Sequence, residues 1–419
     1  MNIIVMRSEV EGTLTAPPSK SMTHRALVLS ALADGKSTIA NPLTADDTEA
    51  TASVLGNLGV NLVRGKKWMV GGGCFKAPKY DLYCGESGTT LRFMAAVCAL
   101  VNDECRLTGG KSLSARPVGP LLNALTQIGV NCTSRRDLPP VTIMGNGRIQ
   151  GGEVRLPGDI SSQFVSALLA VSPLADAPIK INLTTQLESR PYVAMTIDAM
   201  RAFGVEVQAS PDMRRLTAPL RPYRASAVDV EGDWSSAAYF LAAGALTGGA
   251  SLRGLNRTSS QADRAIINLL SRMGADVSTG GAVKVSKSLL RGISADMSDC
   301  PDLFPVVSTL CATAEGESTL TGLGRLRLKE SDRVAAMVEG FTRMGIKVRC
   351  DPDSAKITGG KPRGAEVNSW GDHRIAMSLA ILALTAEGET KINDAGCVSK
   401  SYPGFWDDLA AIGGRLEKI

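Results

Sequence analysis

Positively charged side chains recur in short polar loops along this chain, each loop beside an apolar helical stretch. A single surface Lys or Arg is usually a solvated bystander. A loop at a helix N-terminus, however, offers free backbone N–H groups as well as charge. Cations gathered in such loops favour a cleft for substrates with several anionic groups, phosphate and carboxylate among them. The basic residues are Lys20, Arg25, Arg92, Arg116, Lys329, Arg333, Arg374 and Lys400.

Two acidic residues stand among these cations. Asp302 lies in the loop CPDLFP, and Glu330 lies in KESDR, which has the pattern of a helix start. An acid between bases can be a simple ion pair. In a dry cleft the two carboxyl groups can instead serve as base and acid. The two histidines, His24 and His373, each precede an arginine in such a loop, and we expect them to orient their loops.

An internal repeat positions these loops. Helical stretches end six times in a glycine turn followed by a strand, at intervals of 68 to 75 residues. A glycine directly after a helix is the usual left-handed stop. The glycines are Gly59, Gly129, Gly204, Gly274, Gly345 and Gly413.

The polar loops recur with the same period. Each opens an Ala/Leu-rich helix that a β-branched strand follows, so each unit reads as βαβαββ. Solenoid repeats are usually shorter, about 20–45 residues, which favours two globular halves of three units each. Helix capping is the competing role for the serines of these loops, which include Ser161, Ser162, Ser235 and Ser236. We expect the chain to cross between the halves near residues 221–234.

Composition narrows the class of protein. Hydrophobic residues make up 44% of the 419 residues and charged residues 21%, as in an ordinary globular protein. A net charge of +5 and 4% aromatics argue against a nucleic-acid binder. The nine cysteines include no C-x-x-C pair, which predicts reduced thiols in a cytoplasmic protein. No apolar run is long enough for a membrane span, and phosphate-loop, dinucleotide, zinc-hydrolase and nucleophile-elbow motifs are absent.

Six of the loop sequences together resemble the 5-enolpyruvylshikimate-3-phosphate synthase family, in order and over nearly the whole chain. No single string carries the resemblance. The strings are PPSKSMTHRALVLSALADG (17–35), GESGTTLRF (85–93), GDISSQF (158–164), LKESDRV (328–334), GDHRIAM (371–377) and VSKSYPGF (398–405).

The resemblance implies an α/β fold of two globular domains, each of three βαβαββ units with the helices beneath outward-facing sheets, an inside-out α/β barrel. One domain would span 14–226 and the other 1–13 plus 227–419, with the active site in the cleft between them. The reaction it implies is transfer of the enolpyruvyl group of phosphoenolpyruvate to the 5-hydroxyl of shikimate 3-phosphate, with release of phosphate. It implies no metal, no cofactor, no nucleic-acid or membrane partner, and a monomer.

The matching strings also imply roles for single residues. Asp302 would be the base at the 5-hydroxyl and Glu330 the proton donor at C3, with Lys20 also catalytic. The residues implied for shikimate 3-phosphate are Ser21, Arg25, Ser161, Ser162, Gln163, Ser189 and Lys329. Those implied for phosphoenolpyruvate are Gly88, Arg116, Arg333, Arg374 and Lys400, with Lys20 and Gln163 touching both substrates and Arg92 also in the binding site.

Three positions depart from the common family pattern. Glu86 stands where many members carry Asn, and its charge would repel phosphoenolpyruvate unless a cation neutralised it. Arg190 replaces a common Lys, and Arg325 falls where some members have Asn. These departures affect the expected specificity rather than the expected reaction class.

Two alternative functions remain open on the sequence. UDP-N-acetylglucosamine enolpyruvyl transferase shares fold and donor, but it would carry a reactive cysteine on a mobile loop and lack SKSMTHR. Cys105, the nearest candidate, reads as core. The other alternative is a non-catalytic binder of phosphorylated metabolites, which would gain nothing from placing Asp302 and Glu330 against its anions.

Overall fold

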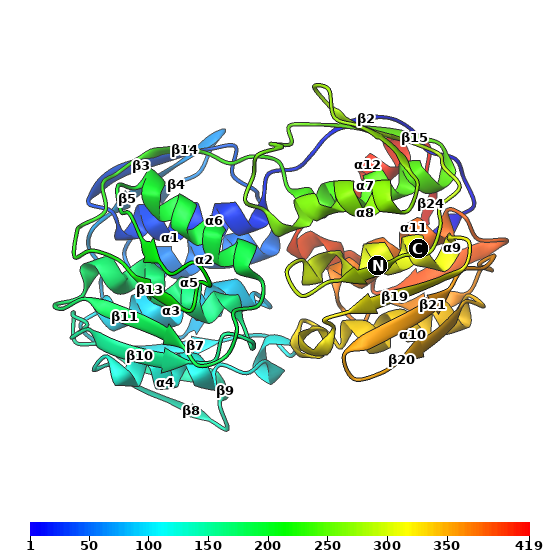
Figure 1. The fold of residues 1–419 in the computed structure, drawn as a ribbon. Helices are drawn as coiled ribbons and strands as arrows, with labels where there is room; N and C mark the ends of the chain where they lie inside the picture. The colour runs from blue at the N-terminus through cyan, green and yellow to red at the C-terminus, as the bar shows by residue number, and fades with distance from the viewer. The chain divides into compact units, whose positions relative to one another are not determined.

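The structure, a computed structural model, describes all 419 residues and divides into two compact units. One is Met1–Pro17 with Gly232–Ile419, and the other is Pro18–Glu231 (Figure 1). The chain passes from one unit to the other after Pro17 and again after Glu231. Hydrogen bonds join the two chain segments at these points. In the first unit the Asp233 N–H donates to the Pro17 carbonyl (2.7 Å), and in the second the Ser19 N–H donates to the Glu231 carbonyl (2.9 Å).

Unit Pro18–Glu231 contains three four-stranded sheets, in the orders β14-β3-β5-β4, β6-β7-β9-β8 and β10-β11-β13-β12. Its helices are α1 (Lys20–Leu32), α2 (Asp46–Asn57), α3 (Gly88–Val97), α4 (Gly119–Gln127), α5 (Ser162–Val171) and α6 (Arg190–Ala202). Its strands are β3 (Gly35–Ala40), β4 (Asn61–Val63), β5 (Lys67–Gly72), β6 (Leu82–Tyr83), β7 (Glu104–Thr108), β8 (Asn131–Arg135), β9 (Leu138–Met144), β10 (Gly152–Leu156), β11 (Ile179–Leu183), β12 (Gln208–Ala209), β13 (Arg215–Thr217) and β14 (Ala227–Asp229).

The other unit repeats this plan, with sheets β16-β17-β15-β2, β18-β19-β21-β20 and β22-β23-β1-β24. Its helices are α7 (Trp234–Thr247), α8 (Ile266–Arg272), α9 (Phe304–Thr313), α10 (Arg333–Arg343), α11 (His373–Ala383) and α12 (Phe405–Ala411). Its strands are β1 (Ile3–Met6), β2 (Glu11–Thr15), β15 (Gly249–Arg253), β16 (Asp276–Ser278), β17 (Val283–Ser286), β18 (Ser294–Asp296), β19 (Glu317–Thr321), β20 (Lys347–Cys350), β21 (Ser354–Thr358), β22 (Glu366–Asn368), β23 (Glu389–Asn393) and β24 (Arg415–Lys418).

All six sheets share one topology, which confirms the βαβαββ repeat. In the sheet of β6, β7, β9 and β8, for example, β6 and β7 run parallel while β9 is antiparallel to both β7 and β8. A parallel pair requires a crossover connection, and α3 supplies it here. Distant segments complete three of the sheets: β14 pairs with β3, β1 with β23 and β24, and β2 with β15.

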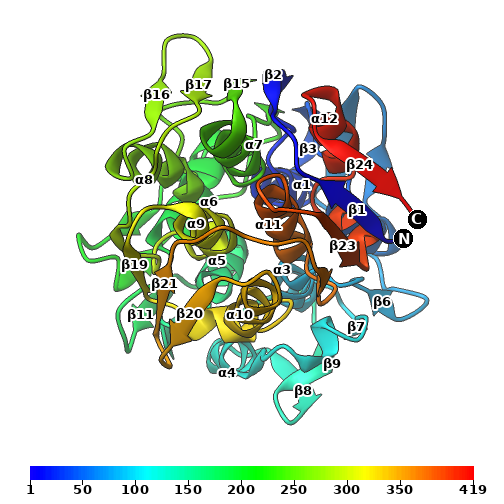
Figure 2. The same cartoon turned by 90° about the vertical axis from the view of Figure 1, so that its right-hand side faces the viewer.

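The helices form the core and the sheets face outward, as expected. Helices α3, α5, α7, α9 and α11 are buried almost all round, as a helix with apolar residues on every side must be. The strands instead alternate buried and exposed positions, as in β7 (ECRLT). Figure 2 shows α7, α9 and α11 side by side within their unit, with β15, β17, β19 and β21 around them.

The glycine turns are confirmed as helix stops. Gly59, Gly129, Gly204, Gly274, Gly345 and Gly413 all have positive φ, between 80° and 107°. That region is open to glycine at little cost. No helix is both long and apolar enough to cross a membrane.

Candidate active site

Asp302 is the centre of a cluster of charged side chains in unit Met1–Pro17 plus Gly232–Ile419. Its Oδ1 lies 2.8 Å from Nη1 of Arg333 and 3.6 Å from Nζ of Lys329, and its Oδ2 lies 2.9 Å from Nη2 of Arg374. Asp302 lies on η5 (Pro301–Leu303) directly before α9, and Lys329 directly follows η6 (Gly324–Leu328). The two arginines come from the starts of α10 and α11. Two neighbouring repeats therefore contribute to this cluster, and four expected site residues lie together.

Arg333 joins this carboxylate to a second one that the sequence argument missed. Its Nε and Nη2 donate to the two oxygens of Asp372, at 2.8 and 3.4 Å. Burial opposes the charge of the Arg333 guanidinium, but the carboxylates of Asp372 and Asp302 outweigh burial and raise its pKa. Asp372 also accepts a bond from the Arg374 N–H as the N-cap of α11. Its place in the motif GDHR was the available signal.

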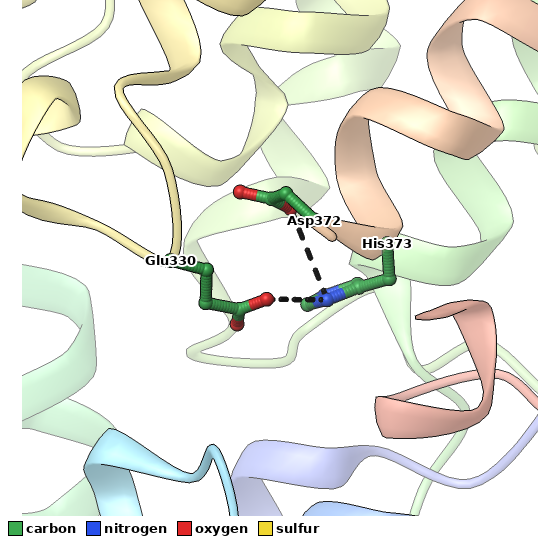
Figure 3. A group of neighbouring side chains, drawn as sticks. All are labelled: Glu330, Asp372 and His373. Carbon is green, nitrogen blue, oxygen red and sulfur yellow. Dashed lines mark hydrogen bonds and ion pairs between the residues drawn. The ribbon is translucent and has the colours of Figure 1, made fainter. Parts of the chain in front are cut away.

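Glu330 faces the imidazole of His373. Its Oε2 lies 2.9 Å from Nδ1 of His373, and Oδ1 of Asp372 lies 3.9 Å from the same nitrogen (Figure 3). His373 therefore does more than orient its own loop, because it contacts the expected proton donor. These three residues have the composition of a metal site. The Arg333 guanidinium, however, already pairs with Asp372 and lies 3.9 Å from Glu330, so it supplies the positive charge that a metal would bring.

Two further groups belong to this unit. The Lys400 ammonium donates to the carbonyl of Gly371, the first residue of the GDHR motif, at 2.7 Å. Asp263, on η4 (Ala262–Ala265), is buried and accepts a hydrogen bond from the Ser235 hydroxyl. Burial, and after it the charge of Asp302, raises the pKa of Asp263 to about 7, against the opposing effect of Arg374.

Unit Pro18–Glu231 carries the remaining expected residues. The Lys20 ammonium lies 2.7 Å from Oδ2 of Asp47, a second partner that the sequence argument missed although Asp47 stands in the first turn of α2. Arg25 is buried and donates to Thr196 Oγ1 and to the carbonyls of Ser21 and Tyr192, each at 2.8 Å. Burial lowers the pKa of Arg25 to about 10, so it remains cationic at neutral pH.

Gln163, in the first turn of α5, is held against α3. Its Oε1 accepts a hydrogen bond from Arg92 Nη1 at 2.5 Å, and its Nε2 donates to Thr89 Oγ1 at 2.8 Å. Burial, with the charge of nearby Arg116 as a second cause, lowers the pKa of Arg92. Nη1 of Arg92 donates to Gln163 and Nη2 donates to the Pro117 carbonyl, so this arginine holds the Gln163 side chain in place.

Arg116 packs on the backbone of Gly88. A Cβ at Gly88 would lie 2.5 Å from Nη1 of Arg116, so a side chain at residue 88 would force the guanidinium to move. The glycine therefore lets the guanidinium approach the backbone this closely. The GESGTTLR loop and the ARP turn, far apart in the sequence, meet at this contact.

The serines divide between capping and other roles. Ser161 Oγ accepts a bond from the Gln163 N–H at 3.3 Å as the N-cap of α5, and Ser162 is the first residue of that helix. Ser189 precedes α6 with a left-handed backbone, φ 53°. In the loop before α7 the N-cap is Asp233, which accepts from the Ser236 N–H, so capping there belongs to neither Ser235 nor Ser236.

The family follows from comparison with known proteins. The family model described as EPSP synthase (3-phosphoshikimate 1-carboxyvinyltransferase) matches residues 4–409. The chain belongs to the EPSP synthase family. It is an enzyme of the transferase class, which removes the non-catalytic binder from consideration.

Relatives from several organisms support this assignment. A 3-phosphoshikimate 1-carboxyvinyltransferase of Dehalococcoides mccartyi is 43% identical over 99% of both chains, and one of Methanocorpusculum labreanum is 40% identical over 100% of both. A solved EPSP synthase from Acinetobacter baumannii superposes with a TM-score of 0.83 at 28% identity, covering 100% of this chain and 99% of that one. The enolpyruvyl transferase NikO from Streptomyces tendae, at 18% identity over 99% of this chain and 98% of its own, shares the fold with a TM-score of 0.79.

The three residues that depart from the family pattern each form a hydrogen bond with a backbone group. Arg325 Nη2 donates to the Ser298 carbonyl at 2.6 Å, and Arg190 Nε donates to the Leu187 carbonyl at 3.3 Å. Glu86 Oε2 accepts from the backbone N–H of Leu113 at 2.8 Å. A backbone donor therefore binds the carboxylate for which the sequence suggested a neutralising cation.

The cysteines of this EPSP synthase family member are all free thiols. Cys84, Cys98, Cys105, Cys300, Cys311 and Cys397 are buried, and burial raises the pKa of Cys84, Cys300 and Cys397. A buried thiol with a raised pKa is a poor nucleophile. Cys105 is fully buried, which confirms that it is a core residue.

Proposed function

We propose that this protein transfers the enolpyruvyl group of phosphoenolpyruvate to the 5-hydroxyl of shikimate 3-phosphate and releases phosphate. The observation that carries the proposal is the arrangement around Asp302, a carboxylate bound by Arg333, Arg374 and Lys329, with Glu330 beside it on the same loop as Lys329. Carboxylates among cations weaken the binding of anionic substrates. They are nevertheless useful where the reaction also requires proton transfer.

Two carboxyl groups suffice for the proton transfers of this reaction. In the addition step, the substrate 5-hydroxyl oxygen bonds to C2 of phosphoenolpyruvate, its proton passes to Asp302, and Glu330 gives a proton to C3. In the elimination step, C3 returns its proton to Glu330, the C2–phosphate oxygen bond breaks, and the proton held by Asp302 leaves with phosphate. Each carboxyl group ends as it began, so the enzyme is ready for the next cycle.

His373 assists Glu330, the proposed proton donor. Its Nδ1 lies 2.9 Å from Glu330, close enough to hold the Glu330 carboxyl in one orientation and to exchange a proton with it. Lys20, whose ammonium is fixed by Asp47 at 2.7 Å, would stabilise charge that develops as phosphate departs. Proton transfer and charge stabilisation are the only chemistry that the proposed reaction requires.

The proposed binding residues can be assigned to substrate groups by the chemistry of their side chains. Arginine pairs with planar carboxylate or phosphate in two parallel hydrogen bonds, whereas serine and glutamine suit hydroxyl groups and phosphate oxygens. For shikimate 3-phosphate we propose Ser21, Arg25, Ser161, Ser162, Gln163, Ser189 and Lys329. For phosphoenolpyruvate we propose Gly88, Arg116, Arg333, Arg374 and Lys400, with Lys20 and Gln163 contacting both and Arg92 acting through Gln163.

The test is phosphate release from the purified protein. Release that requires both shikimate 3-phosphate and phosphoenolpyruvate, with appearance of the enolpyruvyl ether, is the expected result. Each substrate alone is the matched control. Release only when UDP-N-acetylglucosamine replaces shikimate 3-phosphate would contradict the proposal. We further propose that the protein is a cytoplasmic monomer. Size-exclusion chromatography with light scattering measures its oligomeric state.

A further inference from the structure

Glu86 lies in the loop between β6 and α3, two residues before Gly88, and its carboxylate is enclosed by a neighbouring turn. Oε2 accepts a hydrogen bond from the Leu113 N–H at 2.8 Å. On the other side a Cβ at Gly110 would clash with Oε1. The absence of a side chain at residue 110 therefore lets the turn pack against the carboxylate in its present position.

The turn that Glu86 contacts leads directly to Arg116. The Gly110 N–H donates to the Gly85 carbonyl at 2.8 Å, and the Ser114 N–H donates to the Gly110 carbonyl at 3.0 Å. Leu113 begins η2 (Leu113–Ala115), so its N–H has no partner within that short helix. Glu86 supplies the missing acceptor from 27 residues away. The last bond of η2 then runs from the Arg116 N–H to the Leu113 carbonyl, at 3.0 Å.

These contacts connect Glu86 to Gly88 by way of Leu113 and Arg116. Glu86 binds the Leu113 N–H, Leu113 bonds to the Arg116 N–H, and the Arg116 guanidinium lies against the backbone of Gly88. The first and last residues of this series therefore lie in one three-residue stretch of the GESGTTLR loop. A change at Glu86 alters the bond that holds the start of η2 and is transmitted to the side chain at its end.

We propose that Glu86 is a positioning residue for Arg116, holding through the 109–115 turn the guanidinium that would bind phosphoenolpyruvate. The inference rests on the proposed function, in which Arg116 contacts that substrate. It also accounts for an acidic residue so near an anion site. A carboxylate oxygen that is bound to a backbone N–H and covered by Gly110 is turned into the loop.

Three variants test the inference by steady-state kinetics with both substrates. Glu86→Ala removes the acceptor, and Gly110→Ala places a methyl group where the carboxylate lies. Both should raise the KM for phosphoenolpyruvate about tenfold, as expected for the loss of roughly one hydrogen bond to a charged group, with little change in the KM for shikimate 3-phosphate. Glu86→Gln keeps an amide oxygen at the same place and should restore most of the affinity.

A double-mutant cycle separates positioning from a direct effect of charge. If Glu86 acts only through Arg116, Glu86→Ala should add nothing to the KM change of Arg116→Ala. Additive effects in the double variant, or Glu86→Gln as impaired as Glu86→Ala, would overturn the proposal. If Glu86→Ala fails to fold, as judged by circular dichroism, Gly110→Ala and Glu86→Gln decide the question. Phosphate release by the unaltered enzyme tests the proposed function separately.

Discussion

Oε2 of Glu330 and Nδ1 of His373 lie 2.9 Å apart although 43 residues separate them in the chain. Glu330 follows η6 in one repeat, and His373 opens α11 in the next. The contact therefore exists only because neighbouring repeats place their loops side by side within the unit. It gives the proposed proton donor a fixed orientation and a titratable neighbour.

Replacing Glu330 by Gln should abolish proton delivery to C3 while leaving the shape of the loop intact. General acid catalysis typically contributes about 10²–10⁴-fold, and we expect turnover to fall by that order. In deuterium oxide the reversible addition step should place deuterium on C3 of phosphoenolpyruvate, and Glu330→Gln should stop this exchange. Nuclear magnetic resonance of the vinyl protons measures it. Exchange at the rate of the unaltered enzyme would assign the proton donor elsewhere.

Asp302→Asn should remove the base and keep the hydrogen-bonding shape of the side chain. Turnover should again fall about 10²–10⁴-fold, while calorimetry should still detect shikimate 3-phosphate binding. The exposed neighbour Asp299 supplies a matched control, since Asp299→Asn changes the same residue type three positions away. Full phosphate release by Asp302→Asn would exclude Asp302 as the base.

The fold could be predicted from the sequence because its signals are local. Gly59 and its five equivalents stop helices by a backbone conformation that each position requires by itself. The polar loops likewise announce helix starts, as Asp332 and Asp372 show by capping α10 and α11.

The pairings within the site could not be predicted in the same way. Arg333 and Asp372 are 39 residues apart, and Lys20 and Asp47 are 27 apart, so only the packing of helix starts decides which carboxylate meets which cation. The same holds for β1, which completes a sheet with β23 and β24 from the far end of the chain. The sequence marks Glu86 as unusual, but its hydrogen bond with the backbone N–H of Leu113 exists only in the folded turn.

The thiols should be dispensable for turnover. Cys74 and Cys350 are exposed, and neither lies among the proposed site residues. Alkylation with iodoacetamide should modify these two first and leave phosphate release unchanged. Mass spectrometry of Cys74→Ser and Cys350→Ser identifies the modified positions. Rapid inactivation that phosphoenolpyruvate prevents would instead indicate a reactive cysteine in the site.

Asp263 should make stability depend on pH near neutrality. Burial and the charge of Asp302 raise its pKa to about 7 in the folded protein, from a reference value of 3.8. Between these values the folded state binds more protons than the unfolded state, so this group lowers stability as the pH rises.

Asp263→Asn removes that titration. Relative to the unaltered enzyme, the variant should gain about 2–3 kcal/mol in the free energy of unfolding between pH 5 and pH 8. Urea unfolding at both pH values measures the difference, with the exposed Asp276→Asn as the control. A stability gap that is the same at pH 5 and pH 8 would mean that Asp263 does not titrate in this range.

The cations of the proposed site are shared equally between the two units. Lys20, Arg25, Arg92 and Arg116 belong to Pro18–Glu231, and Lys329, Arg333, Arg374 and Lys400 belong to the other unit. Asp47 and Asp372, together with Asp302 and Glu330, offset part of this charge but leave both sets positive. Each substrate brings a carboxylate and a phosphate of roughly −1.5 to −2.

Anionic ligands that contact both sets should therefore hold the two units closer together than in the free enzyme and exclude water from the reacting atoms. Small-angle scattering should show a smaller radius of gyration when shikimate 3-phosphate and a non-reacting phosphoenolpyruvate mimic are both saturating. Added salt should weaken the effect, because charges more than about 8–10 Å apart are screened at physiological ionic strength. A radius of gyration that stays constant at saturation, in enzyme shown to release phosphate, would mean that charge neutralisation does not drive closure.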